Sequence, residues 1–140
     1  MATVYGDNAT KALSPSPSNI INPGLVGGRL RVSVDTYEAS SLAAGSLIYM
    51  CPPLPAGAKV IGMVLSYDAL GTGVTLKVGD ASADGRYFAA ASAASAGTRN
   101  TIDIDSIGYE ITSSTGQIII TTGGAAATGT IKLVVLWSQE

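Results

Sequence analysis

Carboxylates and a single thiol are the side chains of this sequence that could take part in chemistry. The sequence contains no histidine, so it lacks the commonest general base and the commonest metal ligand. Neither a Ser-His-Asp triad nor a Cys-His pair can therefore form. Cys51 is the only cysteine, which excludes an intramolecular disulfide and a cysteine-based zinc site. We expect no catalytic residue, no cofactor and a structural thiol at Cys51.

Two acidic groups remain as candidates. Asp80, Ser82 and Asp84, followed by Gly85, have the first half of the spacing of a calcium-binding loop. The twelfth position of that loop requires a glutamate and here is Ala91. A polar hairpin turn between Val78 and Tyr87 is the simpler interpretation, and ion binding at 80–84 stays open as the alternative.

The second acidic group is Asp103 and Asp105, which alternate with isoleucines. On a strand, both carboxylates would project from one face about 7 Å apart. Paired carboxylates at such separations can hydrolyse glycosides. No sugar-stacking aromatic cluster accompanies them, so we expect a solvated strand face.

The overall charge limits the possible partners. The formal net charge is -2 and the isoelectric point is about 4.9, which gives no basic field for nucleic acid. No segment approaches the roughly 20 apolar residues of a membrane helix, and the polar start does not fit a signal peptide. Only 13% of the residues are charged, against about 25% in soluble domains. We expect that another protein surface covers part of this one.

These residues must be positioned by β-strands. Alternating or continuous apolar runs predict strands, and glycine- or proline-rich turns separate them. The expected strands are residues 29–35, 46–50, 59–67, 74–78, 101–104, 117–122 and 130–137, with weaker ones near 86–89 and 109–111. In the first of them, Leu30, Val32 and Val34 form the expected buried row. The only helix candidate, 89–96, could equally be a strand or loop of small residues. The pattern predicts an all-β antiparallel sandwich, jelly-roll-like, over residues 29–140.

Two of these strands, 59–67 and 130–137, are apolar on both faces, which is typical of strands covered on both sides. The second cover could come from another subunit or from loops of the same chain. We expect a homo-oligomer, with the second apolar row at the interface. That row comprises Val60, Val64, Val134 and Leu136.

Residues 1–28 read as an extended N-terminal arm. Prolines at positions 15, 17 and 23 and a glycine pair at 27 and 28 break any helix or central strand. The arm nevertheless carries enough apolar side chains to dock on a partner, although a tail without a role is the alternative. The expected contact residues are Val4, Tyr5, Ile20, Ile21, Leu25 and Val26.

The sequence resembles the head-decoration, or capsid cement, proteins of tailed bacteriophages. The resemblance lies in the polar start, the Pro-Gly arm and several short segments of the β-domain. These segments are residues 1–8 (MATVYGDN), 76–80 (LKVGD), 86–90 (RYFAA) and 95–97 (SAG). The resemblance implies a jelly-roll-like domain, often trimeric, that binds the major capsid protein on the capsid exterior and stabilises the shell.

We therefore expect a non-enzymatic virion protein, assembled in the host cytoplasm, that acts as a homotrimer on a phage capsid. The arm would cross neighbouring capsid subunits while the β-domain trimerises. The alternative is a carbohydrate-binding or host-adhesion module of a phage fibre or tail. That alternative requires an exposed aromatic platform, for which one tryptophan, one phenylalanine and six tyrosines are available.

Overall fold

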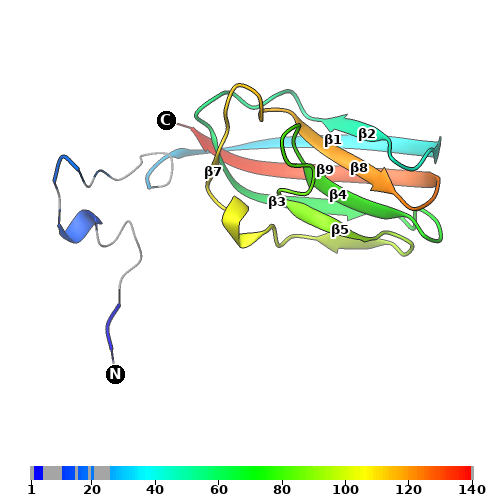
Figure 1. The fold of residues 1–140 in the computed structure, drawn as a ribbon, viewed down its shortest axis with the longest axis horizontal. Coiled ribbons are helices and arrows are strands. Elements are labelled where there is room, and N and C mark those ends of the chain that lie inside the picture. The colour runs from blue at the N-terminus through cyan, green and yellow to red at the C-terminus, as the bar shows by residue number, and fades with distance from the viewer. Residues whose placement is uncertain (1, 5–10, 15, 19, 21–25, 140) are drawn as a thin grey trace.

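A computed structural model of the chain describes residues 2–4, 11–14, 16–18, 20 and 26–139. The expected arm is thus described only in part. Within that part, residues 11–13 are helical, so the prediction that the arm contains no helix is wrong there (Figure 1). Within the described residues, the fold consists of two antiparallel β-sheets packed face to face (Figure 1). The prediction of an all-β sandwich is confirmed. No described helix combines the length and apolar character needed to cross a membrane.

Sheet A is the five-stranded sheet. Its strand order is β1-β9-β3-β6, and β7 also pairs with β3. The strands are β1 (Arg29–Leu42), β3 (Lys59–Tyr67), β6 (Gly97–Arg99), β7 (Tyr109–Glu110) and β9 (Ala127–Gln139). The long strands β1 and β9 pair from Arg29 opposite Gln139 to Leu42 opposite Ala127. Figure 1 shows the start of β1 and the end of β9 together at one end of the sandwich.

Sheet B is the four-stranded sheet, with the order β2-β8-β4-β5. Its strands are β2 (Leu47–Met50), β4 (Thr75–Gly79), β5 (Phe88–Ser92) and β8 (Ile118–Gly123). The alanine-rich segment 89–96 is therefore partly a strand, because β5 occupies its first residues. Between β8 and β9, Gly124 has a φ of +78°, and a Cβ there would overlap the carbonyl of Gly73. Only glycine fits this turn.

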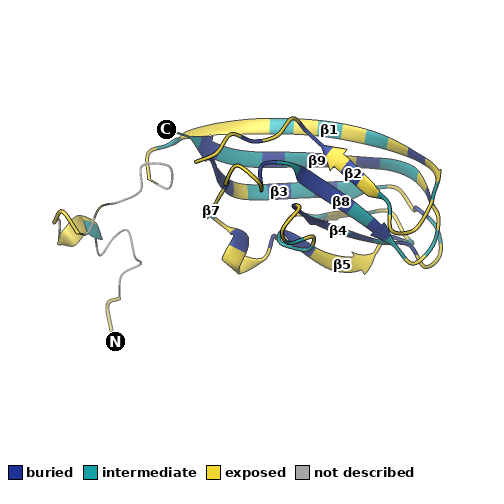
Figure 2. Ribbon diagram, turned by 45° about the horizontal axis from the view of Figure 1, so that its top comes forward, coloured by how far each residue is buried: buried dark blue, intermediate teal, exposed yellow. Residues whose placement is uncertain are grey.

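The core lies between the two sheets and is almost entirely apolar. Sheet A contributes Met63, Leu65, Ile131, Leu133 and Val135, which are at most 1% exposed. Sheet B contributes buried leucine, isoleucine and valine side chains from the facing rows of β4 and β8. Figure 2 shows the result as bands of alternating burial along the strands, mainly buried and intermediate on β9 and β3. This alternation follows from the two-residue period of a strand.

Candidate interaction surface

One half of the outer face of sheet A is apolar. Val34 lies opposite Val134, which in turn lies opposite Val64 on the other side of β9. One step along, Val32 lies opposite Leu136. Residues directly opposite one another in antiparallel strands share a face. We define the apolar half as Leu30, Val32, Val34, Val64, Val134 and Leu136.

The side chains of the apolar half are in contact with solvent and none carries a charge. Leu30, Val32 and Val34 on β1 are 65%, 60% and 59% exposed, and the other three are half-buried. Single exposed apolar residues are normal, but a contiguous uncharged patch marks an interaction site. This half of sheet A is the strongest candidate for such a site.

The predicted interface residues Val64, Val134 and Leu136 fall in the apolar half, whereas Val60 does not. Val60 has no exposed surface and belongs to the core. The strand β3 has a register shift between Val60 and Gly62, which indicates a β-bulge. The extra residue at a bulge breaks the two-residue alternation. Val60 therefore points inward like Met63, and its assignment to an outward row is wrong.

The prediction for β1 chose the right two rows but assigned them to the wrong faces. The expected buried row, Leu30, Val32 and Val34, is exposed. The other row is polar at its start because it makes specific contacts. Ser33 Oγ accepts a hydrogen bond from Trp137 Nε1 at 3.3 Å, and Asp35 Oδ2 accepts one from the Cys51 backbone N–H at 2.8 Å.

Further along the inward row of β1, Tyr37 packs against the core and Ala39 is 2% exposed. The signal for the true orientation was therefore at the end of the strand rather than at its start. The three exposed apolar residues of β1 are the part of the candidate surface that sequence reasoning missed.

The other half of the same outer face is polar. There, Thr130 Oγ1 donates to Glu38 Oε2 at 2.7 Å, and the hydroxyls of Ser66 and Thr98 lie 3.0 Å apart. Lys132 on β9 lies opposite Ser66 on β3. We call Thr36, Glu38, Ser66, Thr98, Thr130 and Lys132 the polar half. A shallow groove of about 470 Å³ runs along it, and Tyr67 is the one aromatic residue among those that line it.

The predicted contact residues of the arm are only partly described. Val4, Ile20 and Val26 are 84%, 71% and 49% exposed, so their apolar surfaces are available to a partner. Tyr5, Ile21 and Leu25 lie outside the described residues.

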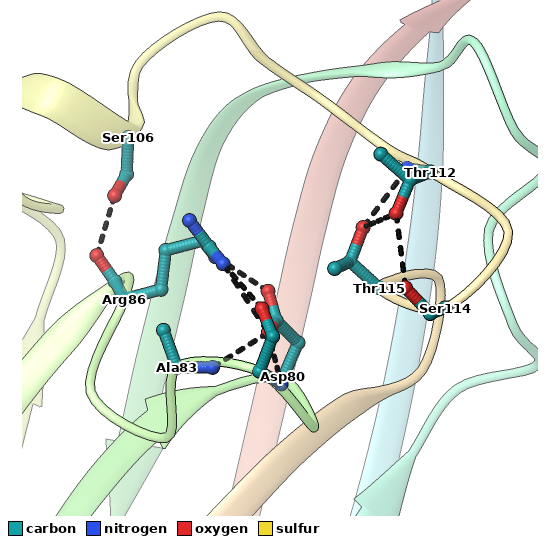
Figure 3. A network of polar contacts seen from close by, with 8 residues as sticks. Asp80, Ala83, Arg86, Ser106, Thr112, Ser114 and Thr115 are labelled. Carbon is teal, nitrogen blue, oxygen red and sulfur yellow. Dashed lines mark hydrogen bonds and ion pairs between the residues drawn. The ribbon is translucent and has the colours of Figure 1, made fainter.

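Asp80 is at the centre of a buried polar network in the turn after β4. Its side chain has no exposed surface and pairs with Arg86, whose Nε lies 2.5 Å from Asp80 Oδ2. The backbone N–H groups of Ser82 and Ala83 donate to Asp80 Oδ1 at 2.9 and 3.0 Å. Figure 3 shows the Arg86 side chain reaching across to Asp80, with Ser106 hydrogen-bonded to the Arg86 backbone carbonyl.

Both carboxylates of the calcium-like segment pair with basic side chains of this chain. Burial alone would raise the pKa of Asp80, but the hydrogen bonds from Arg86, Ala83 and Ser82 outweigh it and lower that pKa. Asp84 pairs with Lys77 at 2.6 Å. In the described part of the chain, no group of three or more potential ligands from His, Cys, Asp and Glu could hold a metal ion. The geometry favours the polar turn over an ion site.

The network also connects two loops of the sandwich. The Arg86 guanidinium lies 4.0 Å from the ring centroid of Tyr109, and Tyr109 meets Tyr87 edge to face at 6.4 Å. Burial, and secondarily the Asp80 charge, raise the pKa of Tyr87. Its hydroxyl is buried without a hydrogen-bond partner. We interpret this cluster as structural, because it fixes the turn after β4 against the segment before β7.

The prediction of a strand at 101–104 is wrong. Residues Ile104–Ser106 form a 3₁₀-helix, η1, for which Asp103 is the N-cap. Asp103 Oδ1 accepts a hydrogen bond from the Asp105 backbone N–H at 3.0 Å. A short aspartate side chain competes with strand pairing in this way. The two carboxylates therefore do not share a strand face, and the spacing argument for paired acids no longer applies.

Cys51 is 8% exposed and has a φ of +64° at the end of β2. Burial raises the pKa of its thiol, and the nearby Asp35 charge acts in the same direction. Both effects disfavour the reactive thiolate.

Comparison with known proteins gives a consistent picture. No protein-family model matches the chain, and no curated protein sequence matches it. Among solved structures, a chain in the capsid asymmetric unit of cyanophage Pam1 is 27% identical, with a TM-score of 0.68. The similarity covers 81% of this chain and 86% of that one.

Two further capsid structures share the fold. A chain in the capsid of Ralstonia phage GP4 is 20% identical with a TM-score of 0.66, covering 81% of this chain and 86% of that chain. A chain in the acid-stable capsid of Helicobacter pylori bacteriophage KHP30 is 14% identical with a TM-score of 0.55, covering 79% and 87%. The sandwich described above is thus a fold found in the capsids of three phages.

Proposed function

We propose that this chain is a structural, non-enzymatic component of a phage capsid and that it acts as a cement protein on the capsid exterior. The likeness to capsid chains, which spans most of both chains, supports a structural role in a virion. The observation that carries the finer assignment is the apolar half of sheet A. An exposed apolar patch on a sheet face is costly for a free monomer but suits a protein that functions bound to others.

In this proposal, three copies associate around a local symmetry axis and Val64, Val134 and Leu136 lie at the subunit interface. Val134 and Leu136 lie on β9 and Val64 lies on the neighbouring β3, in the region where the face is apolar on three adjacent strands. Burial of these side chains would stabilise the trimer, because each large apolar side chain removed from water contributes roughly 1.5–3 kcal/mol before the entropy cost of ordering is subtracted. The homotrimer would assemble on the shell in the host cytoplasm.

The N-terminal arm supplies the second attachment, to the major capsid protein. Val4, Ile20 and Val26 present apolar surface that the described part of the chain does not bury. Tyr5, Ile21 and Leu25 are further candidate contacts. An extended segment advances about 3.3 Å per residue, so residues 1–28 could cross a neighbouring capsid subunit. The arm contains one basic residue, Lys11, so apolar burial rather than charge would drive its docking.

The test is binding to capsids that lack their decoration. Full-length protein should co-sediment with such particles and raise their thermal stability. Protein without residues 1–28 should remain folded by circular dichroism but bind at least tenfold more weakly. Equal binding by the folded truncation would exclude the arm as a tether. No binding by the full-length protein would exclude the cement function.

The alternative, a carbohydrate-binding or host-adhesion module, has weaker support. The groove in the polar half is lined by hydroxyl groups, by the charged residues Asp68 and Lys132, and by one aromatic residue, Tyr67. Sugar recognition usually combines such hydroxyls with a wider aromatic surface. A glycan array with the purified protein distinguishes the two functions, because a cement protein should bind none of the glycans.

A further inference from the structure

The strand β1 forms one edge of sheet A. Among the described residues it pairs with β9 alone, so its second edge is open to solvent (Figure 2). Its 14 residues contain no proline and no lysine, two residues that often protect such an edge from pairing, and its charged residues are of both signs. The far end is interrupted by a register shift between Ala39 and Leu42. The near half, from Arg29, has no such interruption.

The near half of β1 is complementary to itself. Its outward row is apolar at Leu30, Val32 and Val34. On its inward row, basic Arg29 lies at one end, and acidic Asp35, which also accepts a hydrogen bond from the Cys51 backbone, lies at the other. We propose that two copies of this chain pair antiparallel along this edge, with Val32 on the two-fold axis. Leu30 of each copy then lies opposite Val34 of the other, and Arg29 lies opposite Asp35. The two A sheets become one continuous sheet with a continuous apolar outer row.

Charge and polarity select this register over its neighbours. An axis through Arg31 places two arginines opposite one another, which is unfavourable. An axis through Val34 places Leu30 opposite Glu38. An axis through Ser33 keeps Val32 against Val34 but leaves Leu30 opposite Thr36. The Ser33 axis also brings Arg31 opposite Asp35, so charge alone does not separate it from the Val32 axis. Among these four registers, only the Val32 axis pairs every apolar residue of the row with another apolar residue.

This pairing does not depend on the proposed function. It uses the backbone edge of β1 and leaves the outer faces of Val64, Val134 and Leu136 uncovered for the proposed trimer. On a particle, it would connect neighbouring copies across local two-fold axes. It can be tested on purified protein without capsids, so its failure and failure of the cement function are distinguishable.

The direct experiment places a cysteine at the residue on the two-fold axis and measures how fast a disulfide forms between two copies. Directly opposite residues in antiparallel strands have Cα atoms about 4.5–5.5 Å apart, within the range of a disulfide. The variant Val32→Cys should therefore form covalent dimers under mild oxidation at least tenfold faster than Leu47→Cys. Leu47 is the matched control, because it is similarly exposed (57%) but lies on β2 of the other sheet. The buried native Cys51 is present in both variants, and wild type gives its background rate.

The register has its own controls. Arg29→Asp in the Val32→Cys background should slow dimer capture at least fivefold, because it places two acidic residues opposite one another. Ser33→Cys should crosslink no faster than Leu47→Cys. Faster capture through Ser33→Cys would overturn the Val32 register. Equal rates for Val32→Cys and Leu47→Cys, with both proteins folded by circular dichroism, would overturn the edge pairing itself.

Discussion

The two halves of the outer face of sheet A lie on the same strands but differ in whether their side chains have polar partners. In the polar half, Thr130 binds Glu38 and Ser66 meets Thr98, so the side chains satisfy one another and water covers the rest. In the apolar half, Val34, Val134 and Val64 lie in one cross-strand row without polar partners. Sheet pairing alone does not require this difference, because both halves have the same backbone ladder.

The outer face of sheet A therefore carries two kinds of residue, each suited to a different neighbour. The polar half is suited to permanent contact with solvent. The apolar half is suited to contact with protein, since the sandwich already has a complete core between its sheets. Substitutions in the apolar half should therefore affect association much more than folding.

The largest expected effect is a charge at the centre of the apolar half. Val64→Glu should reduce oligomer formation and capsid binding at least 100-fold, because it places an uncompensated charge in a buried contact. Ser66→Glu is the matched control, two residues along the same face of β3 and opposite Lys132. It should leave both properties within about threefold. Analytical ultracentrifugation and capsid co-sedimentation measure the two effects, and equal losses in both variants would contradict the division of the face.

A substitution in the buried network should do the opposite and affect folding rather than association. Asp80→Asn leaves the Arg86 guanidinium without its carboxylate. Removing one partner of a fully buried pair costs roughly 3–5 kcal/mol; because the Arg86 side chain is 20% exposed, we expect about 2 kcal/mol in the free energy of unfolding. Urea denaturation measures this loss. The folded variant should still associate like wild type, and reduced association of folded protein would contradict a purely structural role.

The same pair predicts an acid-dependent loss of stability. The pKa of Asp80 is lower in the folded protein than in the unfolded chain, where it is about 3.9. Its contribution is therefore complete above pH ~4 and is lost as the pH falls toward the folded-state pKa. Urea midpoints of wild type and Asp80→Asn should converge as the pH falls below 4. A constant difference down to pH 2.5 would assign the effect to another group.

The fold could be predicted from the sequence because apolar periodicity and turn residues agree along most of the chain. The prediction for residues 59–67 matches β3 residue for residue, and the class of the fold is confirmed. The error at 101–104 has a local cause, since Asp103 caps η1 through its own side chain. Such a cap depends on backbone geometry that alternation does not encode.

The candidate surface could be predicted only in part. Val64, Val134 and Leu136 followed from the doubly apolar strands, whereas Val60 was displaced by a bulge that periodicity cannot locate. On β1, both rows are plausible core rows until the partners of Ser33 and Asp35 are known. Those partners, Trp137 and the Cys51 backbone, are distant in the sequence. The face of an edge strand is thus set by long-range contacts.

The smallest expected effect tests this reversal of β1. Val32→Thr keeps the shape of the side chain and adds a hydroxyl, so it measures polarity rather than volume. At 60% exposure, Val32 should tolerate the change within about 0.5 kcal/mol in the free energy of unfolding, as is usual for surface sites. Val135→Thr on β9 is the matched control, because Val135 is fully buried and its new hydroxyl would lack a partner, costing about 1–3 kcal/mol. The measurement is urea denaturation at protein concentrations low enough to keep the chain monomeric, since association through the apolar half would otherwise add to the apparent stability. Equal losses at the two sites would mean that Val32 belongs to the core and that the outer face of β1 is not available to a partner.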